Sequence, residues 1–179
     1  DLGHYSHEFM VRKDSAVKAV TDLKGKQLAT NAAGSAVDIA MRAMLKKAKL
    51  DDKRDVTIIE TAFPNMKPML AERKVELIPG VLPFSTDPQL REMGRTLFTQ
   101  RDALGVNELG FWAARQGFIQ KNRAALVDFT EDMMRIVRWY LAPANHKAAV
   151  EIAAKITKQP AASFDDWLFT DKDYYRDLN

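Results

Sequence analysis

The sequence predicts an α/β protein in which helices cover a mainly parallel sheet. Three short segments, 27–30, 55–60 and 75–78, have the apolar and β-branched composition of strands. Apolar residues at helical spacing follow the first two, which gives the order strand, helix, strand, helix, strand. Parallel strands need crossover connections of this kind, so the order indicates a parallel sheet.

Periodicity and turn residues place the remaining elements along the chain. The expected strands are 7–12, 27–30, 55–60, 75–78 and 107–114. The expected helical segments are 16–23, 37–48, 65–73, 88–95, 119–140, 147–156 and 163–168. A loop at Leu97 follows the fourth of them, and Gly25 is expected at positive φ in a tight turn.

Proline and capping residues set several of these boundaries. Pro68 is tolerable in a helix only in or near the first turn, and the Pro79-Gly80 pair is expected to stop the strand before it. Pro143 ends the long helix, whose apolar stripe extends over about 20 residues. Ser163, with an acidic residue three positions later, fits a capping box that opens the last helix.

The composition is that of a globular protein and excludes several functional classes. The 179 residues suit one domain or two small lobes. No stretch approaches the roughly 20 consecutive apolar residues of a transmembrane helix. The 27 Lys and Arg residues are interleaved with 24 Asp and Glu residues, so the net charge of +3 does not indicate nucleic-acid binding. Without Cys there are no disulfides, thiolate nucleophiles or thiolate metal sites.

Catalytic motifs are missing from the sequence. It contains no phosphate-binding P-loop, dinucleotide fingerprint or H-E-x-x-H zinc motif. Ser35 lacks the second Gly of a nucleophile elbow, which disfavours a catalytic serine. We interpret His4, His7 and His146 as surface residues rather than as metal ligands. The sequence therefore predicts no catalytic residue, no metal site and no cofactor.

Two features favour ligand binding. Loop 31–35 joins a strand to a helix. A helix N-terminus has unpaired amides and the positive end of the helix dipole, and the small residues of this loop allow an anion to approach them. Ser35 is expected to cap this helix, to contact a ligand, or to do both. A helix end contributes only about 0.3 to 2 kcal/mol, so other surfaces must close over a ligand. A tryptophan can stack a ligand; packing in the long helix explains Trp139, whereas Trp112 is the tryptophan that packing explains least.

The turn Asp22-Leu23-Lys24-Gly25-Lys26, with Gly34-Ser35 downstream, is the most specific motif in the chain. Four further segments contribute to the same resemblance: 55–59, 118–123, 138–140 and 143–145. Together they resemble the solute-binding proteins of bacterial ABC importers. The resemblance covers nearly the whole chain, and is greatest to the branch that binds sulfonates, taurine, nitrate and the pyrimidine precursor of thiamine.

The resemblance implies periplasmic-binding-protein-like lobes of the second structural type, joined by hinge strands, that close over a solute. It implies that 16–104 form the second α/β lobe, and that 1–15 and 105–179 form the hinge and part of the first lobe. Relatives have further elements before and after this chain, so the first lobe is expected to be incomplete. Residues 75–77, Val-Glu-Leu, depart from the V-D-A of relatives.

Ligands of this family lie at the carboxyl ends of the strands, as in open α/β sheets generally. The implied ligand-binding residues are Asn31, Gly34, Ser35, Ala36, Phe63, Pro64, Pro79, Gly80, Val81 and Trp112. Asn31 and Ser35 would donate hydrogen bonds, and the helix amides behind Gly34 would hold an anionic head. Phe63 would cover an apolar body, and the hinge would pass near Phe84 and residues 110–112.

The resemblance implies a periplasmic or lipid-anchored, monomeric, non-enzymatic component that binds a small organic anion. It would deliver the solute to a membrane permease and would bind no nucleic acid or cofactor. One alternative is a periplasmic-binding-like domain used as an enzyme of pyrimidine-precursor synthesis or as the effector domain of a regulator. Another is an α/β fragment that no longer binds because its first lobe is incomplete.

Overall fold

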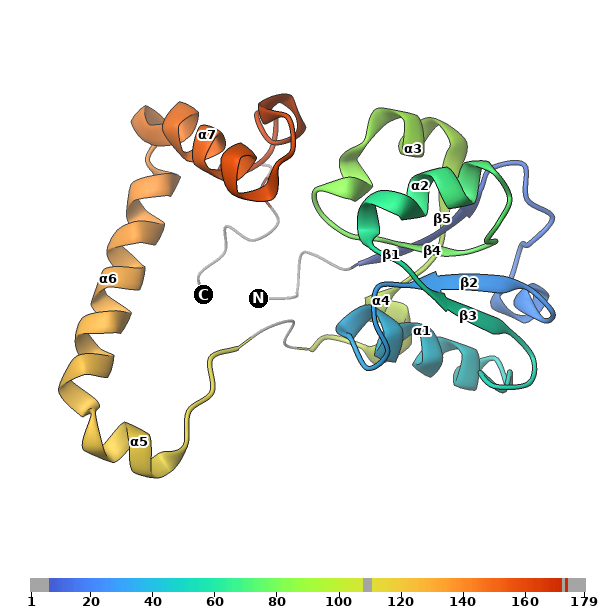
Figure 1. Ribbon diagram of the computed structural model, residues 1–179, viewed down its shortest axis with the longest axis horizontal. Helices are drawn as coiled ribbons and strands as arrows, with labels where there is room; N and C mark the ends of the chain where they lie inside the picture. The colour runs from blue at the N-terminus through green and yellow to red at the C-terminus, as the bar shows by residue number, and fades with distance from the viewer. Residues whose placement is uncertain (1–6, 108–110, 172, 174–179) are drawn as a thin grey trace. The chain divides into compact units, whose positions relative to one another are not determined.

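The computed structural model of the chain describes residues 7–107, 111–171 and 173 (Figure 1). The chain divides into two units, Leu2–Asn107 and Glu108–Asn179. The first unit contains all five strands of the described residues, with α1 to α4, whereas the described part of the second is helical.

Three segments of the first unit run in parallel, as the sequence predicts. β2 (Gln27–Thr30) pairs in parallel with β3 (Thr57–Glu60). On the other side of β2, Leu77 forms a parallel bridge with Leu28, and the Ala29 N–H donates to the Leu77 carbonyl at 2.8 Å. These contacts confirm the parallel part of the predicted α/β fold.

The sequence analysis did not predict the second, antiparallel sheet of this unit. β1 (Glu8–Arg12) lies between β4 (Ile78–Gly80) and β5 (Gly94–Thr99) and is antiparallel to both. Of the predicted strand 75–78, only Ile78 lies in β4 and Leu77 forms a bridge, and the strand continues through Pro79, where it was expected to stop, to Gly80. Pro79 is tolerated because β4 is an edge strand of this three-stranded sheet, so its missing N–H breaks no ladder.

Strand β5 is absent from the prediction, which placed a helix over 88–95 and then a loop at Leu97. The helix α3 (Pro88–Met93) ends before Gly94, where the chain turns into β5. A Cβ on Gly94 would lie 2.9 Å from the carbonyl oxygen of Leu90, so the exit from the helix requires glycine. The predicted helix therefore ran two residues into β5, and the rest of β5 was predicted as a loop because its residues show no clear alternation.

Helices cover both faces of the sheets (Figure 1). α1 (Ala36–Lys47) and α4 (Gln100–Leu104) lie on one face, and α2 (Phe63–Ala71) and α3 lie on the other. Side chains of the strands alternate between two buried clusters. The cluster under α1 includes Phe9, Val11, Leu28, Val37, Met41 and Leu45. The cluster under α2 includes Met10, Ala29, Met66, Leu70, Ile78 and Leu90.

Two predicted helical boundaries are wrong in this unit. Only Val20–Leu23 is helical within 16–23, and it is a single 3-10 turn; a second such turn is Phe84–Thr86. α2 begins at Phe63 rather than at residue 65, with Pro64 in its first turn. Pro68 therefore lies in the second turn and not in the first. The positive φ predicted for Gly25 is confirmed at 77°.

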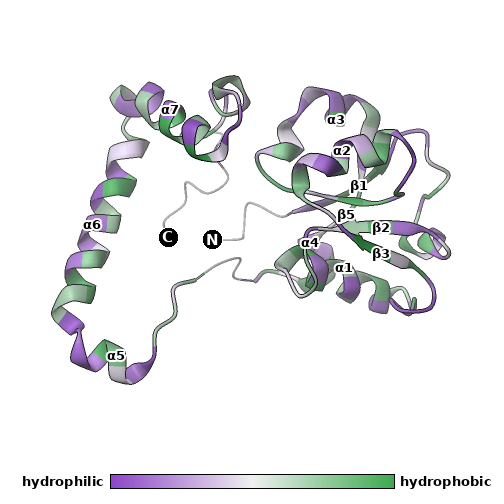
Figure 2. Cartoon of the chain, viewed as in Figure 1, coloured by the Kyte–Doolittle hydropathy of each residue, from purple (hydrophilic) through white to green (hydrophobic). Residues whose placement is uncertain are grey.

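The second unit contains the helices α5 (Gln116–Lys121), α6 (Arg123–Leu141) and α7 (His146–Thr157). A 3-10 turn, Pro143–Asn145, separates α6 from α7, as the proline predicted. Hydrophobic and hydrophilic residues alternate along α6 (Figure 2), yet none of its side chains is buried by the residues that the structure describes. No described helix is both long and apolar enough to cross a membrane.

Two further elements of this unit differ from the prediction. Residues 108–110 of the predicted strand 107–114 lie outside the described residues, and 111–114 form no strand. Phe111 and Trp112 are 77% and 79% exposed. This apolar segment has no neighbouring strand among the described residues, and a strand needs one to satisfy its backbone hydrogen bonds. Instead of a helix over 163–168 there is a 3-10 turn, Ala161–Ser163, and the Ser163 side chain caps no helix within the described residues.

Candidate functional site

Two of the predicted ligand-binding segments of the first unit follow the parallel strands β2 and β3, and the third lies in β4 and just after it. β2 leads to loop 31–35 and α1, β3 leads to α2, and the chain parallel to β2 at Leu77 leads into β4. Carboxyl ends of parallel strands meet at one edge of a sheet. At this edge the Thr61 N–H donates to the Thr30 carbonyl at 2.8 Å, which ties the exits of β2 and β3 together.

Ser35 is the N-cap of α1, as expected from its position. Its Oγ accepts a hydrogen bond from the Asp38 N–H at 3.3 Å and donates one to Oδ1 of Asn31 at 2.7 Å. Gly34 adopts a φ of +75°, a conformation that favours glycine. Both sequence-predicted polar side chains of this loop thus contact each other directly.

The first turn of α1 leaves donors available at the positive end of the helix. The amides of Ala36 and Val37 have no hydrogen-bond acceptor among the residues described. Ala36 is exposed, so a ligand can reach this position. An anionic oxygen is the chemistry that two such amides at a helix N-terminus accommodate.

Asp38, in the first turn of α1, contacts this loop and was missed by the sequence analysis. Its side chain is 2% exposed, and its Oδ2 accepts hydrogen bonds from the Gly34 N–H at 2.8 Å and from Nε of Arg42 at 2.9 Å. Arg42 also forms an ion pair with Asp52. The hydrogen bond to Asp38 raises the pKa of the Arg42 guanidinium, and the contact with Asp52 adds to this effect against the opposing effect of burial. Ser35 followed three residues later by an acid is a capping-box pattern, and that signal could have found Asp38.

Phe63 and Pro64 lie at the start of α2. Phe63 is half-buried and its ring stacks on that of Phe84, with centroids 6.0 Å apart and planes inclined by 23°. Pro64 is exposed. The pair of rings provides an apolar surface next to the exit of β3.

Pro79, Gly80 and Val81 are buried, and the structure shows a packing role for them. A Cβ on Gly80 would lie 3.0 Å from Sδ of Met10, because β1 and β4 pair closely there. The contribution of these three residues to ligand binding remains a prediction.

Trp112 belongs to the second unit, so its contribution beside the loops of the first unit stays a prediction. Its indole packs edge-on against the ring of Phe129, with centroids 5.0 Å apart and an interplanar angle of 63°. Trp139, which the sequence analysis explained by packing, is 42% exposed. The packing that the sequence analysis expected for Trp139 therefore does not bury it among the described residues.

His7 was interpreted as a surface residue, and this is wrong. It is 9% exposed because it lies at the start of β1, and its Nδ1 is 2.7 Å from Oε1 of Gln100. His146 is 3.3 Å from a carboxylate oxygen of Asp165. Among the described residues no group of three His, Cys, Asp or Glu side chains could hold a metal ion.

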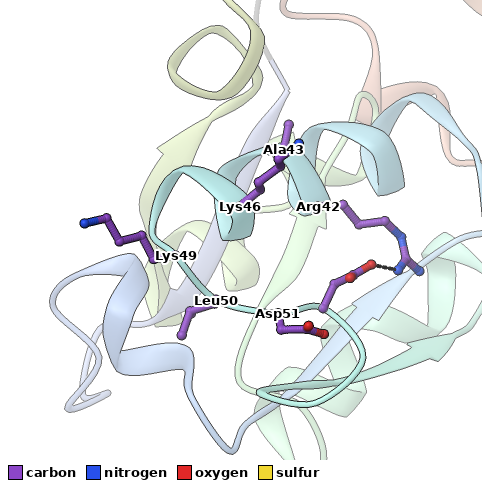
Figure 3. Close-up of a pocket in the computed structure, with 7 residues that line it drawn as sticks. Arg42, Ala43, Lys46, Lys49, Leu50 and Asp51 are labelled. Atoms are coloured by element: carbon purple, nitrogen blue, oxygen red, sulfur yellow. Dashed lines mark hydrogen bonds and ion pairs between the residues drawn. The ribbon is translucent and has the colours of Figure 1, made fainter.

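A surface depression of about 500 Å³ lies at the other end of α1 from Ser35 (Figure 3). It is lined by Arg42, Ala43, Lys46, Lys49, Leu50, Asp51 and Asp52. Arg42 and Asp52 are paired with each other, Asp51 is paired with Arg54, and the Lys49 side chain extends away from Arg42. The depression therefore lacks a converging set of free polar groups.

A comparison with family models decides where the chain belongs. The model of the NMT1-like family matches residues 4–154, which is most of the sequence. This chain belongs to the NMT1-like family. None of the curated proteins matches it.

Solved structures show the fold of this NMT1-like chain. The periplasmic aliphatic sulphonate binding protein SsuA from Escherichia coli matches 90% of the chain at 20% identity and a TM-score of 0.70. The alkanesulfonate-binding protein SsuA from Xanthomonas axonopodis pv. citri, bound to MOPS, matches 88% at 21% identity and a TM-score of 0.60. The desulfurization enzyme DszB, a mutant in complex with biphenyl-2-sulfinic acid, matches 96% at 14% identity and a TM-score of 0.57.

The chain spans about half the length of the sulfonate-binding structures that it matches, 53% and 52% respectively, and 62% of the DszB chain. The periplasmic-binding-protein fold class predicted from the sequence is confirmed by these matches. The partial coverage of the matched structures agrees with the expectation that this chain represents only part of that architecture.

Proposed function

We propose that this chain is the solute-binding part of a bacterial ABC importer and captures a small organic anion of the sulfonate type. The observation that carries this proposal is the N-terminus of α1, where the Ala36 and Val37 amides are unpaired at the edge at which β2 and β3 end. Membership of the NMT1-like family and the likeness to SsuA support it.

In this proposal the anionic head binds at the start of α1 and the organic body lies over the start of α2. Asn31, Gly34, Ser35 and Ala36 surround the head. The side-chain amide of Asn31 donates to it directly, and Ser35 donates once its hydroxyl turns from Oδ1 of Asn31 to the solute. Phe63 and Pro64 cover the apolar body, and the backbone of 79–81 forms a third side. Trp112 contributes from the other lobe.

The lobes in this proposal follow the division given by the resemblance. Residues 16–104 form one lobe, and 1–15 with 105–179 form the hinge and part of the other. β1 then passes from the hinge into the sheet of the first unit, where it pairs with β5. The protein works as a periplasmic or lipid-anchored monomer that delivers its solute to a membrane permease, without cofactor or nucleic acid.

A second candidate is an enzyme, which the similarity to DszB favours. The 179 residues contain no Cys, so they supply no thiolate nucleophile. The described residues of the site offer amides, hydroxyls and a buried carboxylate that is already paired with Arg42. We therefore propose binding without catalysis.

Thermal shift measurements test both candidates with the purified chain. The probes are taurine, hexanesulfonate, nitrate, acetate and a hydroxymethylpyrimidine, with ATP and duplex DNA as controls. A ligand at 100 times its Kd stabilises the folded state by about 2.7 kcal/mol. For a chain of this size that corresponds to a rise in Tm of about 5–11 °C.

A saturable shift with a sulfonate is the expected result. No shift with any probe up to millimolar concentration would overturn the proposal. Release of sulfite from biphenyl-2-sulfinate with repeated turnover would overturn its non-enzymatic part and favour the second candidate.

A further inference from the structure

We propose that Asp38 is a positioning residue that holds loop 31–35 in its ligand-binding conformation. This inference rests on the proposed function and deepens it, because it names a side chain that acts through the loop rather than by touching the solute. Asp38 is not among the residues that the family resemblance implies.

The contacts of Asp38 close the loop onto the first turn of α1. Its Oδ2 accepts the Gly34 N–H at 2.8 Å, and its own N–H donates to Oγ of Ser35 at 3.3 Å. The Ser35 hydroxyl in turn donates to Asn31 at 2.7 Å. Asp38 is therefore joined directly or through one side chain to every polar residue that is proposed to face the head group.

Arg42 fixes the direction of the Asp38 carboxylate. Its Nε donates to the same Oδ2 at 2.9 Å, and the guanidinium is held from its other side by Asp52. In Figure 3 the Arg42 side chain points away from Lys49 and toward its ion-pair partner. Because the carboxylate is held in this way, it can accept the Gly34 N–H only with the loop in its present conformation.

The burial of Asp38 is not explained by stability alone. Its side chain is 2% exposed, and its Oδ1 has no hydrogen-bond partner among the residues described. A buried unpaired oxygen is destabilising, and such departures from good packing are typical of functional sites. In our proposal, the benefit that offsets this destabilisation is that loop 31–35 is held in one conformation.

This arrangement also defines which donors a solute can use. The Gly34 N–H is engaged by Asp38, so the amides that remain are those of Ala36 and Val37. The negative charge of Asp38 lies beside them and opposes an anion, whereas Arg42 offsets that charge. Asp38 thus positions the loop but weakens the electrostatic attraction between the N-terminus of α1 and an anionic solute.

Three variants separate positioning from charge and from stability. Asp38→Ala removes the acceptor of the Gly34 N–H. Asp38→Asn removes the charge and keeps an oxygen in the place of Oδ2. Asp52→Asn is the matched control, because it weakens the same Arg42 network without touching the loop. For each variant we would measure amide hydrogen exchange at Gly34, the Kd for taurine by calorimetry, and Tm.

The expected result is that affinity does not follow stability. Asp38→Ala and Asp38→Asn should both lower Tm, since Arg42 loses an ionised partner. Only Asp38→Ala should speed exchange at Gly34 and raise the Kd by roughly tenfold or more, with Asp38→Asn within about threefold of the parent chain. Asp52→Asn should change Gly34 exchange and Kd by less than Asp38→Ala does, because Arg42 keeps its hydrogen bond to Oδ2 of Asp38.

Two outcomes would overturn the inference. One is an unchanged Gly34 exchange rate in Asp38→Ala. The other is a Kd that rises equally in Asp38→Ala and Asp38→Asn, which would indicate a merely structural ion pair. If the parent chain binds no sulfonate, the proposed function fails separately, and Gly34 exchange still decides whether Asp38 holds the loop.

Discussion

Replacement of Ser35 by alanine separates its structural role from its binding role. The side chain accepts a hydrogen bond of 3.3 Å from the Asp38 N–H and donates one of 2.7 Å to Asn31. Loss of a serine N-cap costs about 0.5–2 kcal/mol, and about 1 kcal/mol corresponds to a fall in Tm of roughly 2–4 °C here. A hydrogen bond to a charged ligand contributes about 1.5–3 kcal/mol, or roughly 10–150-fold in Kd.

Thr99 provides a matched control elsewhere in the same unit. It caps α4, its Oγ1 accepts the Asp102 N–H at 3.2 Å, and it donates to Asp102 at 2.8 Å. Thr99→Ala should therefore lower Tm by a similar amount and leave the Kd for a sulfonate unchanged. Calorimetric titration with taurine and thermal melts of both variants make the comparison.

The reasoning is refuted by either of two results. If Ser35→Ala lowers Tm but leaves the Kd unchanged, Ser35 is a cap and nothing more. If both variants weaken binding equally, the effect comes from general destabilisation. The difference between the two variants, and not the effect of one, measures the binding role of the loop.

Three other predictions follow from the first unit. Gly34→Ala places a Cβ at a φ of +75° and should lower the free energy of unfolding by about 1–2 kcal/mol. Urea denaturation would measure this, and an unchanged midpoint would contradict the proposed backbone strain. Gly80→Ala should cost about 1–3 kcal/mol because the new Cβ lies 3.0 Å from Sδ of Met10, and an unaltered Tm would show that Met10 yields freely. Burial lowers the pKa of His7 below 6.5 more than its hydrogen bond with Gln100 raises it. As the pH falls through about 6.5 the unfolded chain binds a proton that the folded chain resists, so stability should fall from pH 7.5 to 5.5, and less so in His7→Gln. Equal losses in the two chains would exclude His7 as the cause.

The parallel part of the fold could be predicted because local patterns specify it. Segment 27–30 is buried along most of its length, and the helix that follows shows a clear apolar stripe, so both appear near their expected bounds. The antiparallel sheet depends on pairing between residues far apart in sequence. Nothing local to 94–99 shows that it will lie beside β1, so β5 was missed.

The same distinction applies to the candidate site. Ser35 could be found because a cap is a local feature of one helix. The burial of Pro79 and Gly80 depends on Met10, about 70 residues away, and the burial of His7 depends on Gln100. Asp38 lay between these cases, since its capping-box spacing is local but its ion pair with Arg42 is a property of the folded helix.

The energetics of loop 31–35 limit what any variant in it can do. A helix N-terminus supplies about 0.3–2 kcal/mol, whereas a micromolar ligand requires about 8 kcal/mol. Most of the binding free energy must therefore come from apolar and polar contacts outside the first turn of α1, with Phe63 as the nearest apolar candidate in this unit. It follows that Ser35→Ala and Asp38→Ala should weaken binding without abolishing it. A loss beyond about a thousandfold, or more than 4 kcal/mol, would exceed what the loop can contribute and would point to collapse of α1.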